Sequence, residues 1–229
     1  MAITSSSPKI SRPVPVRSKS APALPASALP ASALPATARA TNGAAAGARS
    51  ASTEEHRAQA PVSVRCYVLT VSDTRSIEDD RGGALLEELL EAAGHDVVGR
   101  RIVRDDVNSI VDAVQVASGG IDDPEVIVVT GGTGIAPRDC TPEALRPLLT
   151  KELPGFGELF RHLSFEEVGP AAILSRAFAG VLGRTLLFVV PGSVNAVRLA
   201  TERLIAPEIA HMIRELRPER RQEFAEMNG

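Results

Sequence analysis

Three aspartates could do chemistry, because each follows a stretch that is typical of a buried strand. Asp73 and Asp105 follow the first and second of these stretches, and Asp139 follows the third. Between the third stretch and Asp139 runs the loop Gly131–Gly132–Thr133–Gly134. A glycine loop at the end of a strand commonly brings backbone N–H groups up to a phosphate, and the alternative interpretation is a plain tight turn.

The spacing of this loop fits neither common nucleotide-binding motif. A Walker A loop has a Lys–Ser/Thr pair after its last glycine, and a dinucleotide loop reads G-x-G-x-x-G, but neither pattern occurs here. A phosphate beside the three carboxylates would need a counter-charge, and Mg²⁺ suits a site whose ligands are all oxygen. No His or Lys lies in these loops. This absence counts against acyl transfer and proton abstraction, whereas phosphoryl or nucleotidyl transfer needs mainly positioning and charge neutralisation.

Strands that alternate with amphipathic helices position these residues. Alternating or continuous apolar residues predict strands at 62–71, 96–103, 126–130 and 185–190, and helical patterns cover 85–93, 107–114, 141–149, 173–179, 195–204 and 207–216. This order predicts a three-layer α/β/α domain with a mainly parallel sheet. Because right-handed crossovers bring the carboxyl ends of parallel strands to one edge, the Ser72 loop, the Asp105 turn and the loops at 131–134 and 192–193 should share one rim.

Several of these polar residues also have a purely structural interpretation. Ser72 or Asp73 could cap a turn, and one of the pair Asp105–Asp106 could be the N-cap of the helix that follows. Thr141, before a proline, is the predicted N-cap of the helix after the glycine loop. The three phenylalanines at 156, 160 and 165 are interpreted as a small satellite cluster or a subunit contact rather than as a stacking site for a ligand.

The chain divides into three parts by composition. Residues 1–60 are predicted to be a disordered tail rich in Ala, Pro and Ser, 61–217 a single domain, and 218–229 a short polar C-terminal tail. Residues 1–53 contain six basic and no acidic residues, which leaves 19 basic and 28 acidic residues and a formal charge of −9 for the rest. The first tail resembles an organellar transit peptide in composition, but its regular prolines oppose an amphipathic helix, so a cytoplasmic protein is the main expectation.

Composition also excludes several classes of function. The acidic charge of residues 54–229, the absence of Trp and the single Tyr67 argue against a nucleic-acid partner. No run of about eighteen apolar residues predicts a membrane span. The two cysteines and four histidines show no metal-binding spacing, so Cys66 and Cys140 are interpreted as reduced thiols.

Seven motifs, taken together and in this order, resemble the MoaB/Mog family of molybdenum cofactor biosynthesis proteins, whose domain also occurs in gephyrin and its plant relatives. They are Thr70–Asp73, Thr130–Gly134, Arg138–Asp139, Thr141–Ala144, Gly155–Glu158, Ser175–Arg176 and Pro191–Ser193. The resemblance covers about residues 62–216. The segment Leu163–Gly169 and the short length are more similar to the MoaB branch than to the Mog branch.

The resemblance implies a molybdopterin-binding domain that is usually a homotrimer or a hexamer made of two trimers. In active members, Mg²⁺ and ATP adenylylate the terminal phosphate of molybdopterin, and the product passes to the protein that inserts molybdate. It assigns catalytic roles to Asp105 and Asp139, with Asp105 as the candidate Mg²⁺ ligand. The substrate-binding residues implied are Ser72, Asp73, Gly131, Gly132, Thr133, Gly134, Glu158, Ser175, Gly192 and Ser193.

One position departs from the pattern of the family. Many MoaB-type sequences have Ser-Gly after the acidic pair, whereas this chain has Gly82–Gly83, which removes a possible hydroxyl ligand. Three hypotheses follow: a molybdopterin adenylyltransferase, a non-catalytic binding or carrier protein of the same pathway, and an oligomeric scaffold that binds neither ligand.

Overall fold

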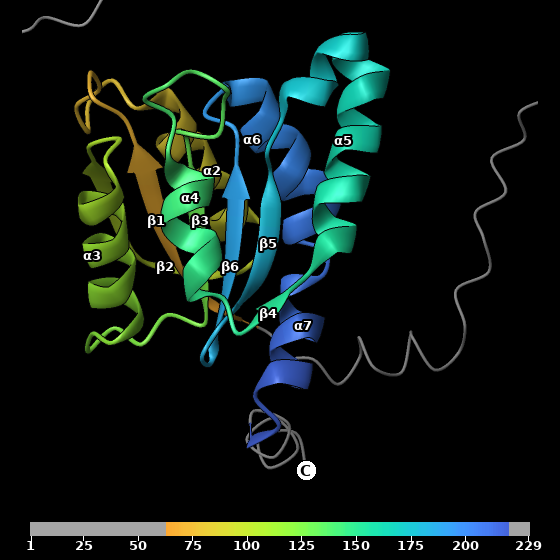
Figure 1. Cartoon of the computed structure of the whole chain (residues 1–229). Coiled ribbons are helices and arrows are strands. Elements are labelled where there is room, and N and C mark those ends of the chain that lie inside the picture. Colours follow the sequence, from red (N-terminus) through yellow and green to blue (C-terminus); the bar gives the residue numbers. More distant parts are fainter. Residues whose placement is uncertain (1–62, 220–229) are drawn as a thin grey trace, which may run out of the picture. The chain divides into compact units, whose positions relative to one another are not determined.

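Six strands form one mixed sheet in a computed structural model that describes residues 63–219 (Figure 1). The predicted tail at 1–60 lies outside the described residues, as do residues 220–229 of the predicted C-terminal tail. The sheet order is β2-β1-β3-β6-β5-β4. The strands are β1 (Arg65–Val71), β2 (Asp96–Val103), β3 (Val126–Thr130), β4 (Lys151–Glu152), β5 (Phe178–Leu182) and β6 (Thr185–Val190). β2, β1, β3 and β6 are parallel, and β5 and β4 are antiparallel to their neighbours, so the sheet is mainly parallel as predicted.

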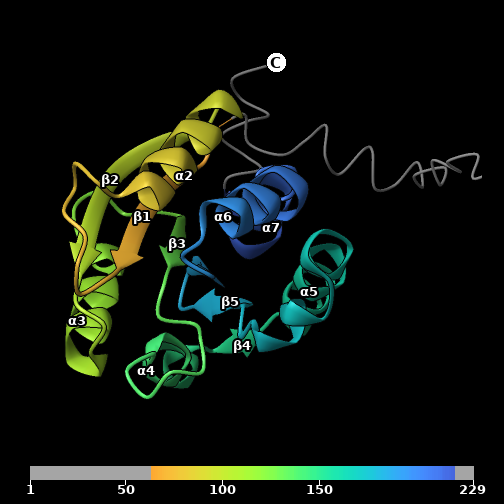
Figure 2. The same ribbon diagram turned by 90° about the horizontal axis from the view of Figure 1, so that it is seen from above.

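Helices cover both faces of this sheet, which confirms the predicted three-layer α/β/α architecture (Figure 2). α2, α5, α6 and α7 pack on one face, and α3 and α4 pack on the other. The helices are α2 (Arg81–Ala92), α3 (Val107–Ser118), α4 (Thr141–Leu145), η1 (Arg146–Leu148), α5 (Pro154–Val168), η2 (Gly169–Leu174), α6 (Val194–Ala200), η3 (Thr201–Ile205, a π-helix) and α7 (Ile209–Leu216). No helix within residues 63–219 is long and apolar enough to cross a membrane.

The central strands β1, β3 and β6 are mostly apolar because helices cover the sheet on both faces. Along β1, Val68 packs into the core beneath α2 and α6, while the next residue, Leu69, packs into the core beneath α3. β3 repeats this alternation with Val128 and Val129, and all its residues are buried. Burial on both faces leaves the loops at the strand ends as the places where polar side chains can meet a ligand.

Capping residues set where α2 begins and ends and where α3 begins. The buried Asp80 accepts a hydrogen bond from the Gly83 N–H (3.0 Å) and is the N-cap of α2. After α2, Gly94 has a φ of +87°, a left-handed conformation that glycine readily adopts where a helix ends. Asp106 caps α3 through the Ser109 N–H (2.9 Å). The N-cap of the predicted pair is therefore Asp106, which leaves Asp105 free for another role.

The prediction of a helix at 173–179 is wrong. η2 ends at Leu174, and Phe178–Leu182 form β5, which pairs with β6. The Ala-rich local sequence favours a helix, but antiparallel pairing and burial on the sheet decide for a strand, which is how tertiary context overrides local propensity. The two-residue strand β4 was also not predicted, because a pattern this short carries no period.

The prediction that Thr141 is an N-cap is wrong by one residue. Cys140 is the residue before α4, it makes no side-chain capping bond, and Thr141 is the first helical residue. The Thr141 hydroxyl instead donates to the carbonyl oxygen of Gly131 (3.0 Å). The threonine therefore secures the glycine loop rather than the start of the helix.

The prediction of a satellite cluster or subunit contact is wrong for two of the three phenylalanines. Phe156 and Phe160 are buried in the main core on the α5 side of the sheet. The Phe156 ring meets the Phe188 ring edge-on, with centroids 5.1 Å apart. Phe165 points away from this core and its side chain is 58% exposed.

Candidate functional site

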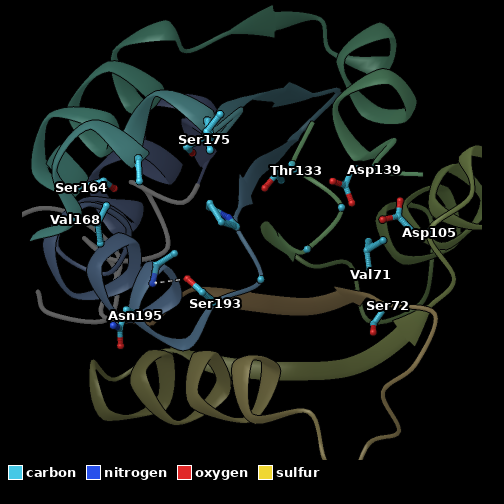
Figure 3. A pocket seen from close by; sticks show the side chains of 18 of the residues that line it. Val71, Ser72, Asp105, Thr133, Asp139, Ser164, Val168, Ser175, Ser193 and Asn195 are labelled. Carbon is cyan, nitrogen blue, oxygen red and sulfur yellow. Dashed lines mark hydrogen bonds between the residues drawn. The ribbon is translucent and has the colours of Figure 1, made fainter. Parts of the chain in front are cut away.

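A pocket of about 640 Å³ lies at the carboxyl ends of the parallel strands (Figure 3). Its walls come from the loops after β1, β2, β3 and β6, and from α5 and η2. The predicted rim is therefore confirmed, since all four predicted loops line one cavity. Of the residues expected in the site, those that line it are Ser72, Asp73, Asp105, Gly131, Gly132, Thr133, Gly134, Asp139, Ser175, Gly192 and Ser193. Glu158 does not line it and is exposed on α5.

The glycine loop follows β3 and lies against the ends of β1 and β6. The space there is too small for a side chain on the loop. Gly131 has a φ of +105°, and its N–H donates to the carbonyl oxygen of Val190 (3.1 Å). A Cβ at Gly131 would lie 2.3 Å from the carbonyl oxygen of Val71. Gly192, on the neighbouring loop, lies so close that its own Cβ would be 3.2 Å from the Gly131 Cα. The two loops thus form one continuous backbone surface.

This backbone surface presents N–H groups that are free to bind a ligand. Within residues 63–219, the N–H groups of Gly132, Thr133 and Gly134 donate to no protein acceptor, and neither do those of Gly192 and Ser193. Unpaired N–H groups that converge on one cavity form an anion-binding arrangement. The geometry favours the anion-binding interpretation of the loop over the plain tight turn.

Asp105 is held against this loop by the start of α4. Its Oδ1 accepts hydrogen bonds from the Cys140 N–H (3.2 Å) and from the Cys140 thiol (3.3 Å). A Cβ at Gly132 would lie 2.9 Å from each Asp105 carboxylate oxygen, so only glycine allows the carboxylate to approach the loop this closely. Burial, followed by the hydrogen bond to Asp105, raises the pKa of the Cys140 thiol to about 12. Cys140 is therefore a hydrogen-bond donor to Asp105 and not a thiolate nucleophile at neutral pH.

Asp139 closes the other end of the glycine loop. Its Oδ2 accepts from the Ala136 N–H (3.0 Å), and a Cβ at Gly134 would lie 2.4 Å from the same oxygen. Arg176 holds the segment from both sides, because its Nε donates to the Thr133 carbonyl oxygen (3.2 Å) and a terminal nitrogen donates to that of Asp139 (2.9 Å). The carboxylates of Asp105 and Asp139 are therefore both held in fixed positions beside the glycine loop.

Arg176 also forms an ion pair with Glu143 on α4. The hydrogen bond from Arg176 holds the pKa of Glu143 below its usual value. The positive charge of Arg176 is therefore engaged by Glu143 and by two carbonyl groups, so it serves to position the loop.

Ser72 and Asp73 combine a structural role with a place in the pocket. The Ser72 Oγ accepts from the N–H groups of Thr74 and Arg75 (3.3 Å each), and the Asp73 Oδ1 accepts from the Asp105 N–H (3.1 Å). The turn-capping interpretation of Ser72 is confirmed by these bonds. Because its hydroxyl only accepts in them, its O–H hydrogen remains able to donate to a ligand.

Ser175 and Ser193 are placed in a similar way. The Ser175 Oγ accepts from the Ala177 N–H (3.3 Å), and the Ser193 Oγ accepts from the Ala196 N–H (3.2 Å) at the start of α6. Each hydroxyl is oriented by the backbone and retains its hydrogen for an anion.

The carboxylates of Asp73, Asp105 and Asp139 fit a Mg²⁺ ion only in part. Each has one oxygen that holds a loop and a second oxygen that accepts no hydrogen bond from residues 63–219. Over the same residues, no three His, Cys, Asp or Glu side chains lie close enough together to hold a metal ion. Mg²⁺ usually binds to one or two carboxylates and completes its shell with water and substrate phosphates. The donors present fit a cation that arrives with a phosphate ligand.

Several lining residues were not identified from the sequence. They are Arg75, Arg138, Phe160, Ser164, Glu167, Val168 and Asn195. Arg138 stood next to Asp139 in a recognised motif, and the segment Leu163–Gly169 was used only to distinguish branches of the family. The approach of Phe160, Ser164, Glu167 and Val168 to the pocket depends on how α5 packs against β5 and α6, and no periodicity reports such packing.

The charge of the lining is acidic. Four carboxylates line the pocket, from Asp73, Asp105, Asp139 and Glu167, against the guanidinium groups of Arg75 and Arg138. The Arg75 guanidinium already contacts the Gly192 carbonyl oxygen (3.4 Å) and the buried Asp80 carboxylate (3.7 Å). An anion can therefore enter only where backbone N–H groups, Arg138 or a cation offset the carboxylates.

Comparison with known families agrees with this fold and site. Residues 67–211 match the family described as "Probable molybdopterin binding domain", and the chain belongs to this family. Within it, the chain lies on the MoaB branch of the MoaB/Mog proteins. It is 52% identical to "Molybdenum cofactor biosynthesis protein B" of Halalkalibacterium halodurans over 74% of this chain and 99% of the relative. It is 49% identical to the protein of the same name in Bacillus subtilis, again over 74% and 99%.

Solved structures show the same likeness. A crystal structure of a molybdenum cofactor biosynthesis protein B has a TM-score of 0.67 at 50% identity and covers 69% of this chain and 99% of its own. The tungsten cofactor synthesizing protein MoaB from Pyrococcus furiosus has a TM-score of 0.63 at 40% identity, with the same coverage. A MogA structure has a lower identity of 31% and a TM-score of 0.60, which agrees with the MoaB branch.

Proposed function

We propose that the protein acts in molybdenum cofactor biosynthesis by binding molybdopterin in this pocket and transferring an adenylyl group from Mg-ATP to its terminal phosphate. Membership of the molybdopterin-binding family and the names of its relatives support the pathway. The observation that carries the reaction is the pairing of Asp105 and Asp139 with the free N–H groups of one glycine loop. This arrangement combines phosphate binding with carboxylates that can share a cation.

The proposed reaction needs no side-chain base. An oxygen of the terminal phosphate of molybdopterin attacks the α-phosphorus of ATP, the bond from that phosphorus to the bridging oxygen of the β-phosphate breaks, and pyrophosphate leaves with the electron pair. The nucleophile is already anionic at neutral pH, so no proton has to be removed. Catalysis of this kind rests on alignment and charge neutralisation, and the pocket lining within the described residues contains no His or Lys.

The residues have separate roles in this proposal. The N–H groups of Gly132, Thr133 and Gly134 bind phosphate oxygens of the substrate. The free oxygens of Asp105 and Asp139 would hold Mg²⁺, with Asp105 as the principal ligand. When bound, Mg²⁺ neutralises the charge on the transferring phosphate. Ser72, Ser175 and Ser193 donate hydroxyl hydrogens to the remaining anionic oxygens.

A non-catalytic binding or carrier protein of the same pathway is the second candidate. The observation that favours it is that Asp73, Asp105 and Asp139 each already hold a loop in place through one oxygen. All three could therefore have been retained for the shape of the pocket alone. On this alternative, molybdopterin binds but no adenylyl transfer follows.

Assembly into a homotrimer or homohexamer is part of the proposal. Large apolar side chains on α5 and η2 that do not line the pocket are exposed in the single chain, namely Leu159, Phe165 and Ile173. A concentration of exposed apolar groups on neighbouring elements is typical of a protein interface. The adenylylated product would then pass to the protein that inserts molybdate.

Incubation of the full chain with molybdopterin, ATP and Mg²⁺ tests the reaction directly. The expected result is adenylylated pterin together with one equivalent of pyrophosphate, both dependent on Mg²⁺. Calorimetric titration of molybdopterin alone is run in parallel. Pterin binding without any product over a wide range of Mg²⁺ would establish the carrier alternative instead, and an absence of binding to either ligand would favour the scaffold.

A further inference from the structure

A second cavity opens beside the pocket at the outer edge of β2. It is a groove of about 860 Å³, and we refer to it as the β2 groove. Ser72, Asp73 and Arg75 line both the pocket and the groove, so the two cavities meet at the loop after β1. β2 pairs only with β1 in the sheet of the described residues, which leaves its outer edge open.

The groove and the pocket have opposite charges. The groove is lined by four arginines (Arg75, Arg100, Arg101 and Arg104) and by two carboxylates (Asp73 and Asp112). Its formal charge is therefore +2, whereas the two arginines and four carboxylates of the pocket give −2. A ligand with a strongly anionic end would be attracted to the groove and repelled by the bare pocket.

Two of the four arginines are already committed to the protein. Arg100 donates to Glu87 and to the Ile77 carbonyl oxygen (2.8 Å each), and its side chain is only 15% exposed. Arg75 donates to the Gly192 carbonyl oxygen. These contacts shape the groove, and their loss would disturb α2 and the loop after β6.

The other two arginines are available to a ligand. Arg101 is exposed and has no hydrogen-bond or ion-pair partner within residues 63–219. The Arg104 side chain is 84% exposed, and its only contact there is 4.0 Å from the Asp73 carboxylate, too long for a hydrogen bond. The Arg101 guanidinium is unpaired, and that of Arg104 makes only the long ion pair with Asp73, so each offers planar donors that suit phosphate oxygens.

We propose that the β2 groove holds the β- and γ-phosphates of ATP before transfer and the pyrophosphate after it. This inference rests on the proposed adenylyl transfer and assigns Arg101 and Arg104 to the leaving group. The shared chemistry of the two ligands is a diphosphate anion. Since pyrophosphate leaves on the side of the α-phosphorus opposite to the nucleophile, it needs a place outside the molybdopterin cavity. The basic groove, joined to that cavity at Ser72 and Asp73, supplies one.

Calorimetric binding to the full chain tests this assignment without any turnover. Pyrophosphate, the α,β-methylene analogue of ATP and AMP are titrated, each with Mg²⁺, into the wild-type chain and the variants Arg101→Gln and Arg104→Gln. Each substitution should weaken binding of pyrophosphate and of the analogue about fivefold, and the pair about twenty- to thirtyfold, the range expected for exposed charge contacts that act independently. AMP has no diphosphate, so its affinity should not change.

Arg203→Gln is the matched control, because Arg203 is an exposed arginine on η3 that lines neither cavity. It should leave all three affinities unchanged. Equal affinity of wild type and the double variant for pyrophosphate would overturn the assignment, and so would an equal loss for AMP. If the wild-type chain makes no adenylylated pterin but the arginine-dependent binding of pyrophosphate persists, the reaction has failed while the diphosphate site stands. If product forms but the arginines do not matter, the reverse holds.

Discussion

Replacing Asp105 with asparagine separates the carboxylate's negative charge from its role in holding the pocket together. The amide oxygen of asparagine can still accept both hydrogen bonds from Cys140, and the backbone N–H at 105 can still donate to Asp73. The free carboxylate oxygen, however, becomes an NH₂ group that cannot bind Mg²⁺. The substitution therefore removes a cation ligand while it keeps the contacts of the loop.

The expected effects differ in size for stability and for activity. Exchanging a charged for a neutral acceptor in two half-buried hydrogen bonds should cost about 1 kcal/mol, or about 2–4 °C in Tm for a domain of this size. Loss of one preorganised ligand to the cation that neutralises the reacting phosphate should reduce adenylyl transfer about 10²–10³-fold, equivalent to about 2.7–4 kcal/mol. The variant should also need a higher Mg²⁺ concentration for its remaining activity.

Asp106→Asn is the matched control for this experiment. Asp106 is adjacent in the chain, but it faces Ser109 as the N-cap of α3 and does not line the pocket. Asparagine caps helices as well as aspartate does, so both stability and transfer should stay close to wild type. Transfer is followed by pyrophosphate release across a Mg²⁺ titration, with Tm measured on the same samples. An Asp105→Asn chain that transfers at the wild-type rate, or that loses activity only in step with unfolding, would refute the assigned role.

Three further predictions concern the glycine loop and its neighbours. Asp139→Asn keeps the hydrogen bond from the Ala136 N–H but removes the negative charge. Adenylyl transfer should therefore fall about a hundredfold, while the calorimetric affinity for molybdopterin changes by less than about threefold. A parallel fall in affinity would assign Asp139 to binding only. Gly131→Ala should lower the free energy of unfolding in urea by about 3 kcal/mol or more, because φ is +105° and a carbonyl oxygen lies where the Cβ would be. Gly94→Ala, at a φ of +87° with no atom within 4 Å of the added Cβ, should cost only about 1 kcal/mol, and equal costs would contradict this account. The pKa of the Cys140 thiol is raised from 9.0 to about 12, so the thiol of the native protein should react with iodoacetamide at pH 8 far more slowly than that of the unfolded chain. The contribution of the protonated thiol to stability is complete below pH 9 and should fall as the pH rises towards 12. Rapid alkylation of Cys140 in the native protein, identified by mass spectrometry, would refute this.

The sequence was a good guide where a residue's role depends on its immediate neighbours in the chain. Apolar runs predicted β1, β2, β3 and β6, and the N-cap of α3 is one of the predicted pair Asp105–Asp106. It failed at 173–179, which was assigned to a helix, because η2 ends at Leu174 and β5 begins at Phe178. A strand of that kind is stabilised by its pairing with β6 across the sheet, and local propensity carries no information about the partner.

The site shows the same division. Motif and spacing were sufficient to predict the glycine loop, its two carboxylates and their common rim, because parallel strands joined by right-handed crossovers must end on one edge. They were not sufficient to place Glu158, which lies outside the pocket. Nor could they find Glu167, about two and a half turns further along α5, because its position depends on how that helix packs. The positive charge of the β2 groove also could not be read from the sequence.

The four parallel strands, the glycine loop and the aspartates beside it were therefore determined by the sequence alone, because each depends on periodicity, on backbone freedom or on the handedness of crossovers between parallel strands. Only the tertiary structure decided which aspartate caps a helix and which faces the pocket. It also decided that Cys140 donates to Asp105, and that Arg101 and Arg104 border an open edge. These relations join residues that are far apart in the chain or on different faces of an element, and packing alone sets the distances between them.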